Sequence, residues 1–140
     1  MHEFTTQRKI EFVDTDMGGI VHFSRYFVFM ETAEHEFLNA LGTSVVIELE
    51  GRSIGWPRVS VSCEYRSPAR FGEILDIRLR VLRKGRTSMS YEIRFSSGDR
   101  EVALGRSTSV CCEMATGTGV KPIPIPAFIA DRIEEAPRDA

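Results

Sequence analysis

Apolar and polar residues alternate through much of the second half of the chain. Between residues 58 and 114, four runs carry apolar side chains at alternate positions. These positions are Val59, Val61, Cys63 and Tyr65; then Leu75, Ile77, Leu79 and Val81; then Met89, Tyr91, Ile93 and Phe95; and last Val102, Leu104, Val110 and Cys112. Glycine-containing turns separate the later runs. The pattern predicts an antiparallel sheet with one polar face and one covered face.

A spacing of three to four residues replaces this alternation in residues 23–41. The apolar positions there are Phe23, Tyr26, Phe27, Met30, Ala33, Phe37, Leu38 and Leu41. They fall on one broad face of a helix, which Ser24 could cap and Gly42 could end. Val28 and Phe29 widen that face, so we expect a long helix that is enclosed on more than one side.

The remaining segments are shorter or less regular. Ile10 and Phe12 alternate with polar neighbours, which predicts a half-buried strand at residues 7–13. Residues 43–57 fit either an extension of the helix or a short strand. Residues 115–140 form a proline-rich tail, in which the A-F-I-A-D-R-I-E-E stretch predicts one short helix and the last four residues are expected to fray.

One apolar helix and one sheet with a single apolar face can cover each other within a single domain of residues 1–140. We therefore expect an α+β protein in which an antiparallel sheet of about five strands wraps around one long central helix. This arrangement is called the hot-dog fold. Such a sheet has exposed edges, and a dimer that joins two sheets edge to edge would cover them.

The composition is that of an ordinary globular domain. Of 140 residues, 42% are hydrophobic and 27% are charged, and the net charge is −2, so nothing attracts the chain generally to nucleic acid or anionic membranes. The chain lacks a run of about eighteen apolar residues and its N-terminus is polar, so we expect neither a membrane span nor a secretory signal. The three cysteines, two of them adjacent, fit reduced thiols of a cytoplasmic protein better than disulfides or a zinc site.

The stretch D-T-D-M-G-G, residues 14–19, places two carboxylates and two glycines directly before the helix. A helix N-terminus offers unpaired N–H groups and the positive end of the helix dipole, which can stabilise an anion that forms during a reaction. Asp14 or Asp16 could supply the reacting carboxylate. Taken alone, the same residues also fit a turn in which both acids only accept hydrogen bonds from nearby backbone.

Two segments resemble the 4-hydroxybenzoyl-CoA thioesterase family of hot-dog proteins. The first is F-V-D-T-D-M-G-G-I-V-H-F-S-R-Y-F-V-F-M-E at residues 12–31, and the second is C-E-Y-R-S-P-A-R-F-G-E-I-L-D-I at residues 63–77. The resemblance extends over most of residues 7–113. It implies an acyl-CoA thioesterase that needs no metal or redox cofactor. Asp16 would be its catalytic carboxylate, as nucleophile or general base, and the Phe23 backbone N–H would form the oxyanion hole.

The resemblance also implies roles for residues around that carboxylate, at a site on the interface of a homodimer or homotetramer. Gly19 would shape the loop before the helix, and Asp14 would support the catalytic carboxylate from behind. His22 and Tyr26 would contact the acyl group, although either side chain could simply pack at the pocket wall. Glu31 matches a recurrent acid of the helix, which would bond the loop backbone or a neighbouring subunit.

The substrate of such an enzyme carries phosphates, so cations should lie near its pocket. Candidates near one turn are Arg83, Lys84 and Arg86, and candidates near another strand are Arg58, Arg66 and Arg70. Guanidinium groups match the geometry of phosphates. We expect the first group to bind coenzyme A, although solvated turn charges would give the same sequence.

Other functions share many of these features. A hot-dog protein that binds acyl-CoA or an acyl-carrier protein without turnover is one alternative, and an enoyl-thioester hydratase with a catalytic His–acid pair is another. No G-x-S-x-G motif of a serine hydrolase occurs, and His2, His22 and His35 lack the spacing of metal ligands. The sequence leaves open the acyl group and the choice between CoA and carrier-protein thioesters.

Overall fold

The computed structural model describes residues 1–115 and 119–138. A 3-10 turn at Phe12–Asp14 separates the first strand from the long helix. In chain order the elements are β1 (Glu3–Lys9), α1 (Arg25–Ala40), β2 (Ile47–Leu49), β3 (Arg52–Gly55), β4 (Arg58–Tyr65), β5 (Ile74–Lys84), β6 (Ser88–Ser97), β7 (Arg100–Val110), β8 (Cys112–Ala115), β9 (Gly119–Pro122) and α2 (Ala127–Ala130).

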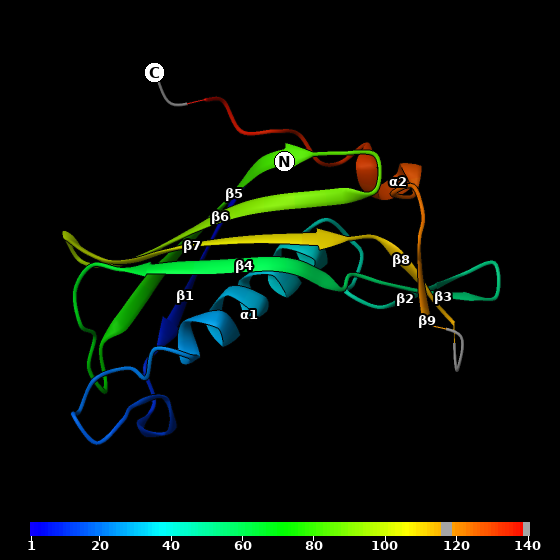
Figure 1. Ribbon diagram of the computed structural model, residues 1–140. Helices are drawn as coiled ribbons and strands as arrows, with labels where there is room; N and C mark the ends of the chain where they lie inside the picture. The colour runs from blue at the N-terminus through cyan, green and yellow to red at the C-terminus, as the bar shows by residue number, and fades with distance from the viewer. Residues whose placement is uncertain (116–118, 139–140) are drawn as a thin grey trace.

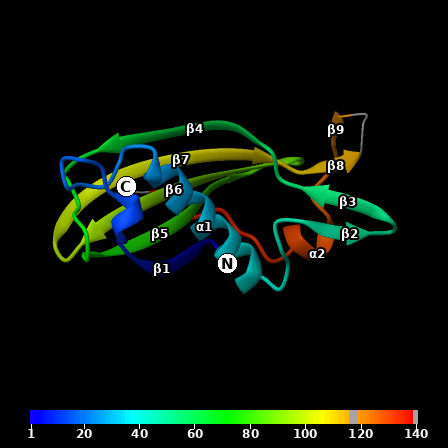
Figure 2. The ribbon, with the colours of Figure 1, turned by 90° about the horizontal axis from the view of Figure 1, so that it is seen from below.

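The main sheet is antiparallel and contains five strands in the order β1-β5-β6-β7-β4. It curves around α1, which lies on its inner face between the two edge strands (Figure 1, Figure 2). Helix residues that point toward the sheet are buried, among them Phe29, Met30 and Phe37. The expected α+β architecture, in which about five strands wrap around one central helix, is confirmed.

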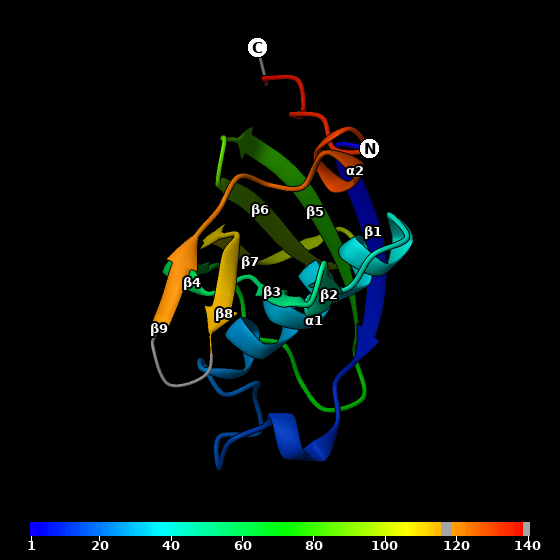
Figure 3. The ribbon, with the colours of Figure 1, turned by 90° about the vertical axis from the view of Figure 1, so that its right-hand side faces the viewer.

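A second sheet of four strands, in the order β2-β3-β8-β9, was not expected from the sequence. It adjoins the main sheet because a single residue, Cys111, separates β7 from β8. Figure 3 shows these four strands together at the end of the molecule where α1 ends. Residues 43–57 therefore contribute the β2–β3 hairpin and no extension of the helix.

The predicted inner faces of β5 and β6 are confirmed, because all eight of their alternating apolar side chains are buried. The predicted inner face of β7 is confirmed only in part: Val102 is buried, as is Cys112 in β8, but Leu104 and Val110 are not. Its buried positions include the small residues Ala103, Gly105 and Ser107, whereas Leu104 is only half-buried. A methyl group on Gly105 would lie 2.5 Å from the sulfur of Met30. The helix therefore approaches β7 too closely for large side chains to fit between them.

The apolar residues of β4 alternate as predicted, but apart from the half-buried Cys63 they are largely uncovered within the protomer. β4 is an edge strand, and among the described residues its ladder partner is β7 alone. Val59 is 65% exposed and Val61 is 46% exposed. The expectation of a covered face is therefore wrong for this strand in a single protomer.

The N-terminal segment differs from its prediction because the chain turns before Asp14. β1 ends at Lys9, and Phe12, predicted as a half-buried strand residue, begins the 3-10 turn and is largely exposed. The Asp14 carboxylate accepts a hydrogen bond from the Glu11 N–H, which closes this turn. α1 begins two residues later than predicted, and Ser24 occupies the N-cap position without a capping hydrogen bond from its side chain.

The described part of the tail packs against the body of the protein. Ile125, Ile129 and Ile133 are buried in the core, and α2 is shorter than the predicted terminal helix. The two ends of the chain meet here, since the Glu134 N–H donates to the Met1 carbonyl oxygen. Residues 116–118 of the predicted tail, and the last two of the four residues expected to fray, lie outside the described residues. Within the described residues, no helix has the length and apolar character to span a membrane.

Candidate active site

The loop before α1 is anchored by Asp14, whose side chain is fully buried. Its Oδ1 accepts hydrogen bonds from Nε of Arg25 at 2.9 Å and from Nη2 at 2.7 Å. Nη2 of Arg8 lies 3.6 Å from the same oxygen, and the Asp14 carbonyl oxygen accepts the His22 N–H. A buried carboxylate with two arginines and a backbone donor is well compensated. Asp14 therefore ties the loop to the first residue of the helix and does not line a cavity.

Asp16 lies in the exposed part of the same loop, in a turn that its own hydrogen bonds define. Its Oδ1 accepts the Gly18 N–H at 2.8 Å, and its carbonyl oxygen accepts the Gly19 N–H at 3.0 Å. The Asp16 N–H donates to the Ile20 carbonyl oxygen at 2.9 Å. Gly19 has a φ of 79°, a conformation that favours glycine. Oδ2 of Asp16 makes no hydrogen bond to any described residue, so one carboxylate oxygen is held and the other is free to react.

Asp16 lines a pocket of about 490 Å³ at the N-terminal end of α1. The other residues of its wall come from the loop, the helix and the end of β4, and they are Ile20, Val21, Phe23, Tyr26, Tyr65, Arg66, Ser67 and Pro68. The wall is mainly apolar and carries a few polar groups, as is usual for sites that bind small molecules. The structure thus brings Asp16, Phe23 and Tyr26 together around one hollow.

The backbone of Phe23 lies just before the helix, where N–H groups have no partner within the helix. The Phe23 N–H donates no hydrogen bond to any described residue. The Phe23 carbonyl oxygen accepts a hydrogen bond of 2.9 Å from the Tyr65 hydroxyl, which fixes this peptide against the end of β4. A substrate oxygen in the pocket could accept the unpaired N–H, close to the positive end of the α1 dipole.

Tyr26 contributes an aromatic wall to the pocket. Its ring packs edge to face against Tyr65 and Phe95, with centroid distances of 5.4 Å in both pairs. Burial raises the pKa of Tyr26 to about 12, and the neighbouring Cys63 and Tyr65 add to this effect. The hydroxyl therefore stays neutral at physiological pH and can donate a hydrogen bond.

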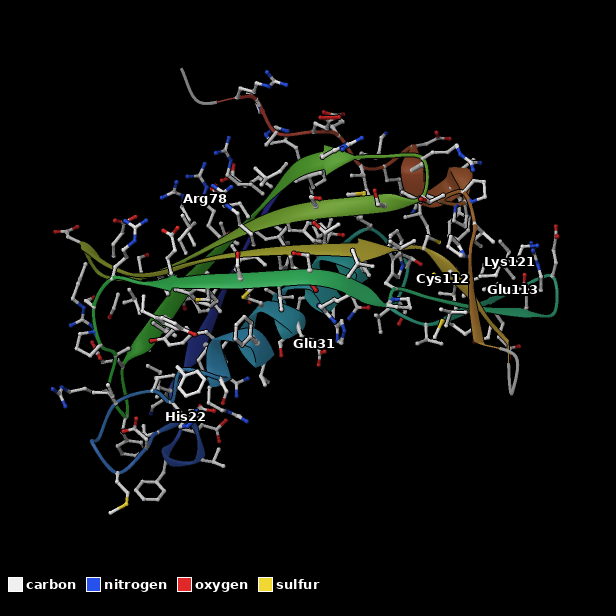
Figure 4. The ribbon with its side chains drawn as sticks, in the orientation of Figure 1. His22, Glu31, Arg78, Cys112, Glu113 and Lys121 are labelled. Atoms are coloured by element: carbon white, nitrogen blue, oxygen red, sulfur yellow. The ribbon has the colours of Figure 1, made fainter. Side chains whose placement is uncertain are left out.

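His22 lies beside the pocket but is not part of its wall. Its Nδ1 is 2.8 Å from the Ser24 hydroxyl and accepts the Ser24 N–H at 3.2 Å. The imidazole stacks on the ring of Phe23 with a centroid distance of 4.5 Å. Figure 4 shows His22 below the first turn of α1. These contacts orient Ser24 and Phe23, and they leave His22 outside the group formed by Asp16, Phe23 and Tyr26.

The three cations expected to bind coenzyme A lie far from Asp16 within the protomer. Arg83, Lys84 and Arg86 belong to the β5–β6 hairpin, at the end of the sheet next to α2, whereas the Asp16 loop lies at the opposite end (Figure 1). Nζ of Lys84 donates to the carbonyl oxygens of Ala130 and Ile133, at 3.0 and 2.9 Å, and so holds the tail in place.

Glu31 does not contact the loop backbone. Its carboxylate is half-exposed and forms an ion pair with Nη1 of Arg58 at 3.2 Å. Figure 4 shows Glu31 in the middle of α1, on the side away from the sheet. The same arginine forms an ion pair with Glu34, which is buried. Burial raises the pKa of Glu34, and the Arg58 guanidinium opposes that rise.

Two residues near these contacts, Glu34 and Arg25, were not predicted from the sequence as functional. Glu34 falls on the apolar stripe of the helix, four residues after Met30 and three before Phe37, so its burial could have been expected. Arg25 had no comparable signal, because its partner Asp14 is eleven residues away across an irregular loop. Among the described residues, no group of three or more His, Cys, Asp or Glu side chains could hold a metal ion.

A second hollow of about 590 Å³ lies on the outer face of the main sheet, among β1, β5 and β6. Its guanidinium groups belong to Arg78 and Arg94, and Figure 4 shows Arg78 on this outer side. Arg78 is paired with Glu3, and Arg94 with Glu92 and Glu101. This hollow lies away from the loop and from the N-terminus of α1, so the pocket beside Asp16 is the better candidate for a reactive site.

Known proteins resemble this chain over most of its length. The profile described as Thioesterase superfamily matches residues 18–104. A 1,4-dihydroxy-2-naphthoyl-CoA hydrolase of Synechococcus elongatus is 29% identical over 117 residues, which cover 83% of this chain and 86% of that protein. The acyl-CoA thioesterase YbgC of Haemophilus influenzae is 22% identical over 123 residues, 88% of each chain. The structure of BH1999 gentisyl-coenzyme A thioesterase has a TM-score of 0.80 and 29% identity, and the match covers 92% of this chain and 98% of that one.

Proposed function

Since the chain belongs to the thioesterase superfamily, we propose that it hydrolyses acyl-CoA thioesters with Asp16 as the reacting carboxylate and the Phe23 N–H as the oxyanion donor. The family confirms the expected thioester hydrolase with a hot-dog fold. The roles of single residues and the identity of the acyl group are the proposal. One observation carries it: a carboxylate with a free oxygen and an unpaired N–H at a helix N-terminus border the same pocket.

In this mechanism the thioester carbonyl enters the pocket and its oxygen accepts the Phe23 N–H. As nucleophile, Oδ2 of Asp16 attacks the carbonyl carbon, and the tetrahedral oxyanion is stabilised by the N–H and the helix dipole. Loss of the CoA thiolate leaves an acyl–aspartyl anhydride, which water hydrolyses. As general base, Oδ2 instead takes a proton from the water that attacks the carbonyl. Both routes end in the free acid and CoA, and neither requires a metal or a redox cofactor.

The hydrogen bond from Gly18 to Oδ1 supports either route, because it fixes the orientation of the carboxylate. A methyl group on Gly18 would lie 3.1 Å from that oxygen, so the turn has little room for a larger residue. Gly19 completes the turn through its positive φ. Reacting groups that are held in this way lose less entropy when the substrate binds.

For the acyl group we propose an aromatic acid with hydroxyl substituents. The pocket wall includes the rings of Phe23, Tyr26 and Tyr65, and an aromatic acyl group could pack among them. The neutral Tyr26 hydroxyl offers a donor to a substituent on the ring. The names of two similar proteins, a 1,4-dihydroxy-2-naphthoyl-CoA hydrolase and a gentisyl-CoA thioesterase, refer to acyl groups of this class.

We also propose that the enzyme is a cytoplasmic homo-oligomer built by pairing of β4 strands. β4 is an eight-residue edge strand with exposed apolar side chains, and pairing with a second copy would cover Val59 and Val61. The hollow bounded by Phe27, Glu31 and Val61 lies along the same edge. In such a dimer Arg83 and Arg86 could reach a CoA molecule only from the neighbouring protomer. The three cysteines are free thiols, as expected for a reducing compartment.

The test measures thiol release from a panel of CoA thioesters by wild type, Asp16→Asn and the control Asp99→Asn. The panel includes 1,4-dihydroxy-2-naphthoyl, gentisyl, 4-hydroxybenzoyl, acetyl and palmitoyl thioesters. We expect kcat to fall by about a hundredfold or more in Asp16→Asn, the usual loss when a catalytic base is removed. Asp99 is exposed on the β6–β7 turn, so its variant should match wild type.

Different outcomes separate the alternatives. Turnover that persists in Asp16→Asn would move the chemistry away from this carboxylate. Tight binding of acyl-CoA without turnover by wild type would identify a binding protein, and hydration of crotonyl-CoA would identify a hydratase. A preference for acetyl or palmitoyl thioesters would refute the proposed aromatic acyl group while leaving the mechanism intact.

A further inference from the structure

Most arginines near the candidate pocket already have partners. Nη2 of Arg66 donates to Glu64 at 2.8 Å, and its Nη1 is 3.7 Å from a carboxylate oxygen of Glu101. Arg25 is bound to Asp14, and Arg100 forms an ion pair of 2.5 Å with Glu73. The positive charge of each of these side chains is at least partly compensated within the protein. An anionic ligand would have to compete with those carboxylates.

Arg70 is different, because its guanidinium makes no ion pair or hydrogen bond with any described residue. The side chain is exposed, and it extends over the turn that carries Asp16. A methyl group on Gly19 would lie 3.8 Å from Nη1 of Arg70. No carboxylate oxygen of Asp16 or Glu73 lies within the 4.0 Å of an ion pair with it. Arg70 is therefore an unpaired cation beside the proposed catalytic turn.

The backbone of Arg70 is firmly held, although its guanidinium is free. Its N–H donates to a carboxylate oxygen of Glu73 at 2.5 Å, and its carbonyl oxygen accepts the Glu73 N–H at 3.1 Å. The preceding residue, Ala69, is buried, and its carbonyl oxygen accepts the Val21 N–H at 2.8 Å. Arg70 and Ile20 form a bridge between the two loops. These bonds hold the backbone of Arg70 next to the Asp16 turn, so a ligand that its guanidinium binds would lie beside that turn.

We infer that Arg70 binds an anionic group of the thioester substrate, a phosphate of CoA or a carboxylate on the acyl group. The inference rests on the proposed function, because it takes a CoA thioester as the ligand. A free guanidinium presents a planar set of donors that matches phosphate and carboxylate oxygens in pairs. All CoA thioesters carry phosphates, so these are the expected partners. Gly19, the residue next to the guanidinium, has no side chain to cover the turn, which leaves space for a ligand.

The test compares Arg70→Ala with wild type on three thioesters. The first is the preferred acyl-CoA, the second is the same acyl group on N-acetylcysteamine, which lacks the phosphates, and the third is a succinyl thioester of N-acetylcysteamine. If Arg70 binds a CoA phosphate, KM for the acyl-CoA should rise about tenfold to a hundredfold, the value of a charge-assisted hydrogen bond. KM for both N-acetylcysteamine thioesters should stay unchanged. If Arg70 binds an acyl carboxylate, the succinyl thioester should show the loss.

Two variants serve as controls. Arg70→Lys keeps the charge but not the planar pair of donors, so it should restore part of the affinity. Arg138→Ala removes an exposed charge in the C-terminal segment and should match wild type. Turnover of the neutral N-acetylcysteamine thioester reports whether Arg70→Ala is correctly folded.

Two results would overturn the inference. One is an unchanged KM for all three thioesters. The other is an equal loss on all three, because that would indicate a role in structure or in the reacting centre. Calorimetry with free CoA and with pantetheine keeps this test separate from the proposed function. Even if wild type hydrolyses no thioester, a phosphate-binding Arg70 predicts that Arg70→Ala weakens the binding of CoA and not that of pantetheine, whereas an Arg70 that binds an acyl carboxylate leaves both unchanged.

Discussion

Replacing Asp14 by Asn tests whether the buried ion pair holds the loop that carries Asp16. The change keeps the size of the side chain and removes its charge. Oδ1 of Asp14 now accepts two hydrogen bonds from Arg25, and Oδ2 accepts the Glu11 N–H at 2.9 Å. In the variant one oxygen becomes an NH₂ group, which would face a donor. At least one of these contacts must therefore be lost or become repulsive.

The magnitude follows from burial. Asp14 is fully buried, and breaking a buried ion pair costs about 3–5 kcal/mol because the remaining charge is uncompensated. Arg25 retains 29% exposure of its side chain, so water can solvate part of the freed guanidinium. We expect the free energy of unfolding to fall by about 3 kcal/mol, near the lower limit of that range. For a chain of this size the loss corresponds to a decrease in Tm of about 10 °C. Because the ion pair joins the loop to α1, kcat should also fall by about tenfold or more.

Denaturant unfolding and thermal melting at one protein concentration measure the stability, and thiol release measures kcat. Glu64→Gln is the matched control, because it makes the same chemical change in an ion pair whose carboxylate is 70% exposed. That variant should lose less than about 1 kcal/mol. If both variants lose the same stability, or if Asp14→Asn is as stable as wild type, burial of the Asp14 pair does not hold the loop.

Two further predictions concern residues outside the loop. Lys84→Met removes the hydrogen bonds to Ala130 and Ile133, so hydrogen exchange in residues 125–136 should accelerate. KM for acyl-CoA should stay unchanged. A raised KM with unchanged exchange would instead support the phosphate-binding role expected from the sequence. Burial raises the pKa of the Cys63 thiol to about 11, so its alkylation at pH 8 should be about a hundredfold slower than in the unfolded chain. The alkylation rate of the folded protein should then rise about tenfold per pH unit up to pH 10. Equal rates in the folded and unfolded chains would contradict this prediction.

The sequence predicted elements well where one protomer supplies both sides of the packing. β5 and β6 lie inside the sheet, so their alternation reports directly which residues face α1. β4 has the same alternation, but alternation shows only that a face is apolar and does not identify what covers it. In β7 the apolar pattern identified the buried Val102 but failed at Leu104, because the helix lies so close that Gly105 is needed beneath Met30. A small residue can occupy a buried position, and a pattern based on hydrophobicity alone does not detect it.

In the candidate site, contacts between residues close in the sequence were predictable, and contacts between distant residues were not. The turn of Asp16 is formed by hydrogen bonds within residues 14–22, so its acids and glycines could be recognised in the sequence as a single turn. The partners of a cation are usually distant: Lys84 bonds to residues 46 and 49 positions away, which only the fold brings near.

Arg66 and Glu64 are an informative exception, because they lie two positions apart at the end of β4, and residues two apart in extended chain share one face. Pairing of these two could therefore have been predicted, and the neighbouring Arg70 has no such partner two positions away. A search for phosphate-binding residues should thus begin by removing the cations whose local pattern already supplies a carboxylate. Applied here, that rule removes Arg66 and retains Arg70, which the structure leaves unpaired beside the Asp16 turn. It also retains Arg58 and Lys84, whose partners are distant in the sequence and are brought near only by the fold.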